Sequence, residues 1–89
     1  MVEKRVVIKN RLGLHARAAV KFVNLANRFS SNVKIIKDTM EIDGKSILGI
    51  LTLAASQGTS VVLRVAGEDE NEAIKALVDL INRKFEEKE

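Results

Sequence analysis

The chain has a single histidine, His15, in the segment RLGLHARAAVKF (residues 11–22), two residues before Arg17. Imidazole is suited to accepting or passing on a group near neutral pH, and a guanidinium nearby supplies charged donors for the oxygens of an anion. The spacing therefore indicates a site where a histidine takes up a phosphoryl group or another anion. From the spacing alone, however, a histidine that only caps a helix beside a solvated arginine is the more common explanation.

The position of His15 at the start of a helical pattern bears on this choice. The first N–H groups of a helix lack internal partners and carry partial positive charge, which favours anions and disfavours imidazolium. We therefore expect a neutral, nucleophilic imidazole beside the backbone N–H groups of Ala16, Arg17 and Ala18. Gly13 is expected to make the turn that precedes it.

Metal and hydrolytic chemistry are not favoured. The chain has no Cys and no second His, so the common zinc ligand sets are incomplete, and no nucleophile–base pair is evident. We expect neither a metal nor a cofactor.

A second notable segment is Ser46 followed by ILGILTL, residues 47–53. Serine is a preferred N-cap, so Ser46 is expected to begin a short helix. Apolar side chains occur nearly all round that helix. The pattern fits a fully buried helix and one that leaves an exposed docking patch equally well.

Length and composition limit the class of protein. The 89 residues are 46% hydrophobic and 30% charged, without Cys, which predicts one globular domain, residues 1–89. Small secreted domains usually carry disulfides, and no apolar run approaches the ~20 residues of a membrane span. The N-terminus also lacks a signal-peptide core. We therefore expect a cytoplasmic protein that is not inserted in a membrane.

Charge is unevenly distributed along the chain. Residues 1–45 carry a balance of +6 and residues 46–89 a balance of −3, for a total of +3. The basic first half favours an anionic partner or ligand. Three Phe with no Trp or Tyr argue against a nucleic-acid partner that relies on base stacking.

Periodicity predicts the elements that position these residues. Strands are expected over residues 2–10, 33–37, 40–42 and 60–66, with helices beginning near residues 16 and 47 and a last helix within 67–85. The resulting order β-α-β-β-α-β-α, with four strands and the long helices on one face, predicts a two-layer α+β sandwich.

The predicted core faces follow from the same periodicity. In the first helix the buried side is expected to comprise Ala16, Ala19, Val20, Val23 and Ala26. In the last helix it is expected to comprise Ile74, Leu77, Val78, Ile81 and Phe85. The strand over 60–66 is expected to bury Val61, Leu63 and Val65.

GLHAR followed by a small-residue helix, with GKSILGILTLAASQGT about thirty residues later, resembles the HPr family of histidine-containing phosphocarrier proteins. The resemblance covers essentially the whole chain in length and element order. It implies an open-faced β-sandwich: a four-stranded antiparallel sheet of order 1-4-2-3, covered on one face by three helices.

The resemblance also implies a phosphoryl carrier rather than an enzyme. Enzyme I would transfer the group to Nδ1 of His15, with Arg17 as electrostatic partner, and the phosphoprotein would pass it to IIA components of sugar permeases. Ser46 matches a serine that HPr kinase/phosphorylase modifies. The implied partner-binding surface comprises Val20, Lys21, Ile47, Leu48, Leu51 and Thr52.

Basic residues around His15 are expected to steer the protein toward acidic partner surfaces. They are Lys9, Arg11, Arg17 and Lys21. We expect the protein to act as a monomer.

Some positions depart from the common family pattern. Ala18 stands where proline is usual, which adds a backbone donor and removes a preset φ. Asn24 and Asn27 replace frequent lysines. Leu12 replaces a frequent Ser or Thr.

Two alternatives to a sugar-pathway phosphocarrier remain. Leucine at position 12 also occurs in NPr, the carrier of a nitrogen-related phosphorelay, so the first is a carrier of that type. The second is a regulatory docking module that binds partners through the apolar helix without being phosphorylated.

Overall fold

The computed structural model describes residues 1–87, so the last two residues of the predicted domain lie outside it. The elements are β1 (Val2–Val7), α1 (Ala16–Ala26), β2 (Asn32–Lys37), β3 (Met40–Asp43), α2 (Ile47–Leu53), β4 (Ser60–Ala66), α3 (Glu70–Asn82) and the 3₁₀ turn η1 (Lys84–Glu86). This order confirms the predicted β-α-β-β-α-β-α arrangement. No helix in residues 1–87 has the length and hydropathy that a membrane span requires.

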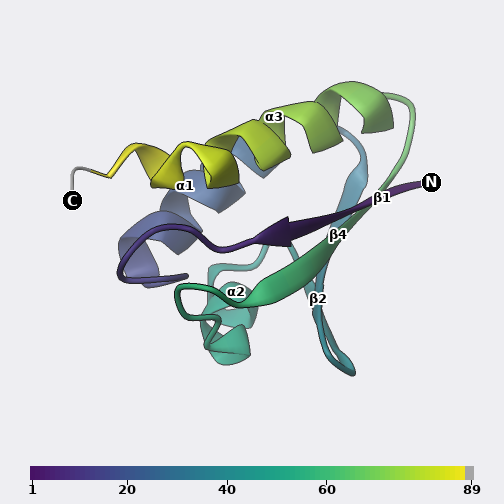
Figure 1. The fold of residues 1–89 in the computed structure, drawn as a ribbon. Helices are drawn as coiled ribbons and strands as arrows, with labels where there is room; N and C mark the ends of the chain where they lie inside the picture. The colour runs from purple at the N-terminus through teal and green to yellow at the C-terminus, as the bar shows by residue number, and fades with distance from the viewer. Residues whose placement is uncertain (88–89) are drawn as a thin grey trace.

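The four strands form one antiparallel sheet in the order β1-β4-β2-β3. The helices lie on one face of it, with α1 and α3 packed together along the sheet and α2 beside one end of α1 (Figure 1). The other face of the sheet is open. The α+β class, the two layers and the strand order are therefore as predicted.

The core lies between the sheet and the helices. In β4, the side chains of Val61, Leu63 and Val65 are buried and alternate with partly exposed neighbours, as the sequence predicts. Alternation of this kind is typical of a sheet with one covered face.

The predicted inner face of α1 is partly wrong. Ala16 and Val20 are exposed, whereas Ala18 and Phe22 are buried. Phe22 is the largest apolar side chain of this helix and is completely buried, and its apolar area dominates the choice of the face turned to the sheet. Ala19, Val23 and Ala26 are buried as predicted.

The predicted end of the last helix is also wrong. α3 ends at Asn82, and the chain then makes a left-handed turn in which Lys84, Phe85 and Glu86 have φ of 57°, 56° and 61°. Phe85 is fully buried as predicted, but from this turn rather than from the helix. Glu87, directly after this turn, contacts His15 at the start of α1.

The buried face of α3 includes two residues that the predicted stripe omits. Ala73 and Leu80 are buried together with Leu77 and Ile81, whereas Ile74 and Val78 pack at the margin of the core.

Candidate functional site

His15 is the N-cap residue of α1, as the sequence indicates. Its backbone is extended (φ −76°, ψ 176°), and its Nδ1 accepts a hydrogen bond from the backbone N–H of Arg17 at 3.2 Å. The first bond of the helix runs from the N–H of Ala19 to the carbonyl of His15 at 2.9 Å. The N–H groups of residues 16–18 therefore lie at the open end of the helix, next to Nδ1.

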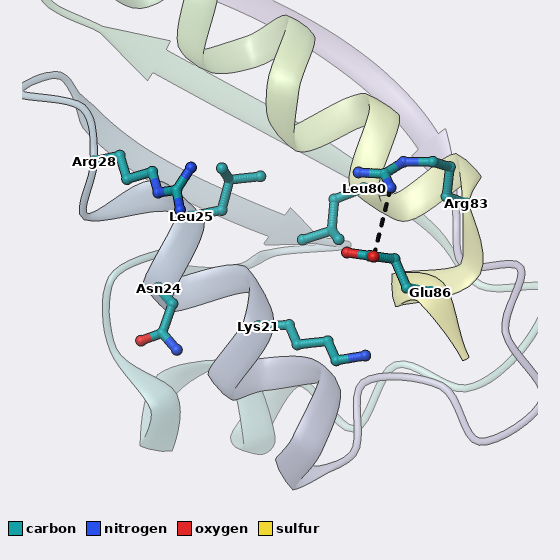
Figure 2. Close-up of a pocket in the computed structure, with 7 residues that line it drawn as sticks. All are labelled: Lys21, Asn24, Leu25, Arg28, Leu80, Arg83 and Glu86. Carbon is teal, nitrogen blue, oxygen red and sulfur yellow. Dashed lines mark ion pairs between the residues drawn. The ribbon is translucent and has the colours of Figure 1, made fainter. Parts of the chain in front are cut away.

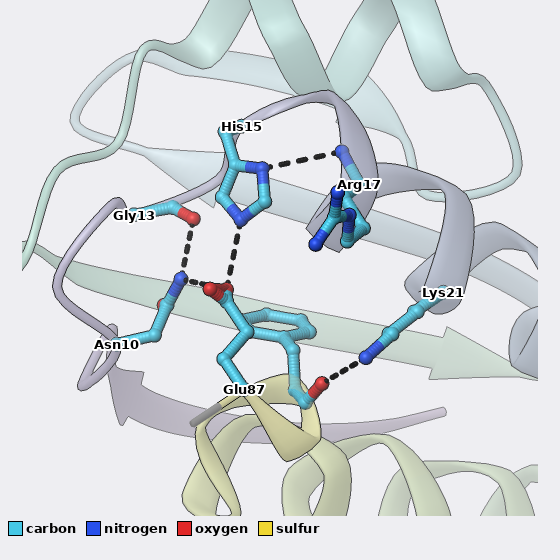
Figure 3. Close-up of polar contacts among 7 residues, drawn as sticks. Asn10, Gly13, His15, Arg17, Lys21 and Glu87 are labelled. Atoms are coloured by element: carbon cyan, nitrogen blue, oxygen red, sulfur yellow. Dashed lines mark hydrogen bonds and ion pairs between the residues drawn. The ribbon is translucent and has the colours of Figure 1, made fainter. Parts of the chain in front are cut away.

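The other ring nitrogen of His15 contacts a carboxylate from the far end of the chain. Nε2 lies 2.8 Å from Oε1 of Glu87 (Figure 3). The side chain of Glu87 is 12% exposed and that of His15 is 26% exposed. The imidazole is thus held at both nitrogens and still borders solvent.

Asn10 connects Glu87 to the loop that carries His15. Its side chain is fully buried, and its Nδ2 donates to the carbonyl oxygen of Gly13 and to Oε1 of Glu87, both at 2.7 Å (Figure 3). Its Oδ1 is also buried and finds no hydrogen-bond partner in the described part of the chain. The amide therefore directs both of its protons to groups that surround the histidine.

The loop between β1 and α1 is fixed by close backbone contacts. The N–H of Leu14 donates to the carbonyl of Ala55 at 2.9 Å. Gly13 has φ of +67°, and a Cβ there would lie 2.5 Å from the Ala55 oxygen. Only glycine fits this position without displacement. The contact with the segment after α2 determines where His15 lies.

α1 and the C-terminal turn are also joined. Nζ of Lys21 donates to the carbonyl oxygen of Phe85 at 2.7 Å (Figure 3). The side chain of Arg17, next to the imidazole, is exposed. Lys9 and Arg11 are exposed as well, and Lys21 is half-buried. The structure therefore gathers the four basic residues named from the sequence on the elements around His15.

Neither Asn10 nor Glu87 was among the residues singled out from the sequence. Glu87 lies 72 positions from His15 in a run of charged residues that reads as a solvated helix end. Asn10 reads as an ordinary polar residue after a strand. The only local signal for Asn10 is its position shortly before the turn at Gly13, where asparagine side chains often bond to the backbone.

Ser46 is the N-cap of α2, and its Oγ accepts a hydrogen bond from the N–H of Gly49 at 3.0 Å. The helix that follows is not fully buried. Ile50 and Leu53 lie in the core, whereas Ile47 is 38% and Leu48 is 76% exposed. Of the two patterns that the sequence allows, the exposed apolar surface is the one observed.

The remaining predicted surface residues lie near this helix. Val20 of α1 is 39% exposed, Leu51 is partly buried, and Thr52 is exposed with its hydroxyl donating to the carbonyl of Gly49 at 2.6 Å. α1 and α2 pack against each other. We refer to Val20, Ile47 and Leu48 as the apolar patch.

A separate open groove lies between α1 and α3 (Figure 2). Its basic side chains are Lys21, Arg28 and Arg83, and Glu86 faces Arg83 at 3.8 Å. Among the described residues, no histidine lines this groove. The candidate reacting group therefore lies outside it, at the end of α1.

Fold and site together define a class of protein: a small open-faced α+β sandwich that presents a single histidine at the N-terminus of its first helix. Residues 2–83 match the family model described as "PTS HPr component phosphorylation site". The chain is also 47% identical, over the full length of both proteins, to phosphocarrier protein HPr of Neisseria meningitidis serogroup A. The chain belongs to the HPr family, which confirms the resemblance seen in the sequence.

Solved structures agree with this assignment. HPr from Thermoanaerobacter tengcongensis superimposes with a TM-score of 0.96 at 52% identity, and 100% of both chains is covered. A structure described as an HPr dimer from the same organism matches with a TM-score of 0.78 at 53% identity, covering 98% of this chain and 100% of that one. The monomeric state expected for the present chain therefore stays a prediction.

Proposed function

We propose that this protein is a phosphocarrier of the phosphotransferase system, with Nδ1 of His15 as the phosphoryl acceptor. The observation that carries the proposal is the position of Nδ1 at the N-cap of α1, 3.2 Å from the N–H of Arg17. A phosphoryl group on Nδ1 would replace this contact and place its oxygens among the N–H groups of residues 16–18. Helix N-termini favour anions in this way.

The transfer requires no proton to leave the acceptor. Because Nδ1 accepts a hydrogen bond from Arg17, it carries a lone pair, which forms the new N–P bond. The bond between phosphorus and the donor breaks, and its electron pair stays with the donor. Onward transfer reverses these events, and the electron pair of the N–P bond returns to Nδ1.

Exposure of the site suits a carrier. His15 is 26% exposed on its side chain, and the surrounding groups do not enclose it, so a phosphoryl group is reachable by successive partners. Arg17 is exposed and free to turn its guanidinium toward the phosphoryl oxygens. The catalytic groups for each transfer would come from the partner, so the protein acts as a carrier and not as an enzyme.

The partners that fit are enzyme I as donor and IIA components as acceptors. The apolar patch, with Lys21, Leu51 and Thr52, supplies a docking surface next to His15. The basic residues around it favour acidic partners and fast, salt-dependent association. The chain contains no Cys, which supports a cytoplasmic location for this relay, and we propose that the protein works as a single-domain monomer.

Ser46 is proposed as a regulatory phosphorylation site for an HPr kinase/phosphorylase. Its Oγ caps α2, and the exposed Ile47 and Leu48 follow it directly. A phosphate there would be tolerated by the helix N-terminus and would add about two negative charges beside the apolar patch. We expect this charge to oppose docking while leaving the fold intact.

The relay assay tests the proposed function. Phosphoenolpyruvate, enzyme I, this protein and a sugar-pathway IIA are combined, and phosphate on each protein is followed by intact mass. We expect one acid-labile phosphate on this protein that passes to IIA, and none on His15→Ala. Phosphate that never reaches the protein, or that persists on His15→Ala, would overturn the proposal.

A further inference from the structure

We propose that Glu87 is a positioning residue for His15: together with the N–H of Arg17, its carboxylate holds the tautomer that exposes the Nδ1 lone pair, and it compensates the positive charge that the ring gains on phosphorylation. This inference rests on the proposed function and adds a residue to the same site. It is carried by the contact of 2.8 Å between Nε2 of His15 and Oε1 of Glu87.

The two hydrogen bonds of the imidazole define one tautomer. The N–H of Arg17 donates to Nδ1, so Nδ1 has no proton. The proton of the neutral ring is therefore on Nε2, and it is donated to the carboxylate of Glu87. A histidine whose second nitrogen is held by a carboxylate keeps both its ring orientation and its proton position.

Glu87 is itself held in place by Asn10. The buried amide of Asn10 donates one proton to Glu87 and the other to Gly13, each at 2.7 Å. Its Oδ1 is buried and has no hydrogen-bond partner among residues 1–87. Buried acceptors without a partner are uncommon, and here the amide is oriented so that its two protons, rather than its oxygen, face the groups around His15.

The backbone before Glu87 is also in a disfavoured conformation. Lys84, Phe85 and Glu86 are three successive left-handed residues, none of them glycine. Such residues persist where surrounding contacts determine them, and they are common at functional sites. Here the burial of Phe85 and the bond from Lys21 to its carbonyl hold the turn. The turn returns Glu87 to the histidine.

The charge of Glu87 matters once the phosphoryl group arrives. The Nδ1 lone pair forms the N–P bond while Nε2 keeps its proton, so the ring acquires a positive charge shared by both nitrogens. The carboxylate beside Nε2 stabilises this charge through a charge-assisted hydrogen bond. When the group moves on, the electron pair of the N–P bond returns to Nδ1 and the ring is again neutral.

Two variants of Glu87 separate orientation from charge. In Glu87→Gln the amide oxygen still accepts from Nε2–H, so the tautomer is kept and the charge is lost. In Glu87→Ala both are lost. Glu86→Gln is the matched control, because residue 86 is the exposed neighbour in the same turn and its carboxylate faces Arg83.

The test combines NMR of the unphosphorylated protein with transfer kinetics. Long-range ¹H–¹⁵N spectra give the tautomer, which we expect to be Nε2–H in the wild type, in Glu87→Gln and in Glu86→Gln, and a mixture in Glu87→Ala. Phosphorylation by phospho-enzyme I is expected to slow about tenfold in Glu87→Ala and less in Glu87→Gln. Glu86→Gln should match the wild type.

An unchanged tautomer and an unchanged transfer rate in Glu87→Ala would overturn the role of Glu87, whereas the proposed function would stand if His15→Ala still accepted no phosphate. If the wild type accepted no phosphate, the proposed function would fail. The tautomer spectra would then decide the role of Glu87 in orienting the ring. Circular dichroism of each variant identifies any loss that comes from misfolding.

Discussion

The imidazole of His15 is restrained at both nitrogens, by the N–H of Arg17 and by the carboxylate of Glu87. The residue types GLHAR were enough to predict the first contact, because it arises within three residues of sequence at a helix start. The second could not be predicted, since it depends on a left-handed turn 70 residues later that no glycine announces. The contact within the GLHAR segment could therefore be predicted from the sequence, whereas the contact with Glu87 could not.

At the residue scale, Arg17 is expected to act on transfer and not on stability. Its side chain is exposed, and exposed side chains without special contacts change stability by only about 0.5 kcal/mol. Arg17→Ala should slow phosphorylation by enzyme I by roughly tenfold, since a charged hydrogen-bond donor to the phosphoryl group is lost. The melting temperature should stay nearly the same.

Arg28→Ala serves as the control for this prediction, because Arg28 is a second exposed arginine that lines the groove away from His15. A large drop in melting temperature for Arg17→Ala would show that Arg17 has a structural role instead.

At the scale of the elements, the start of α3 is tied to the start of β2 through Asp69. Its carboxylate accepts hydrogen bonds from the hydroxyl of Ser31 and from the N–H groups of Ser30 and Ser31. These bonds, above all the one from the Ser31 hydroxyl, hold the pKa of Asp69 below its usual value. The periodicity of the sequence predicted the strands and helices. It could not predict the contact between Asp69 and Ser31, because these residues lie far apart in the sequence and outside any periodic pattern.

A lowered pKa in the folded state makes the contribution of Asp69 dependent on pH. The carboxylate stabilises the fold above the ordinary Asp value of 3.8, and this stabilisation is lost as the pH falls through the lower value of the folded protein. Asp69→Asn should therefore be less stable than the wild type at neutral pH, with a difference that narrows in acid. Denaturant unfolding from about pH 7 to about pH 2 measures this, with Glu68→Gln as control. A difference that is constant down to the acid end would contradict the assignment.

The face of α1 shows why element boundaries and faces are harder to predict than element types. Periodicity predicted the helix, but it also predicted that Ala16 and Val20 face the core. In the structure they are exposed and Phe22 is buried instead. The packing of one large ring decided the rotation. Val20 is consequently left at the surface, where the proposed docking surface needs it.

At the scale of the whole molecule, the histidine and the exposed apolar side chains come from α1, its preceding residue and α2, which pack against each other. The first half of the chain, with its balance of +6, contains the histidine and most of the basic residues near it. Helix α2, which exposes Ile47 and Leu48, comes from the middle of the chain and packs beside α1. Sequence patterns predicted the histidine, the basic residues and the apolar helix separately. In the fold, the loop that carries Gly13 and His15 contacts the segment after α2, which brings the histidine and this helix into one part of the structure.

Ser46→Asp tests whether charge at the apolar patch controls docking. Aspartate is also a good N-cap, so the melting behaviour should change little. The added carboxylate is expected to reduce phosphorylation by enzyme I by roughly tenfold at low enzyme concentration. Ser46→Asn, which keeps the cap without the charge, should behave as the wild type. Equal rates for Ser46→Asp and Ser46→Asn would contradict a regulatory role based on charge.

The most direct measurement is the position of the phosphorus on the phosphorylated protein. After reaction with phosphoenolpyruvate and enzyme I, ³¹P and long-range ¹H–¹⁵N spectra identify the nitrogen bonded to phosphorus. We predict a single phosphorus on Nδ1 of His15, with the proton retained on Nε2 beside Glu87. Phosphorus on Nε2, or on a residue other than His15, would contradict the account.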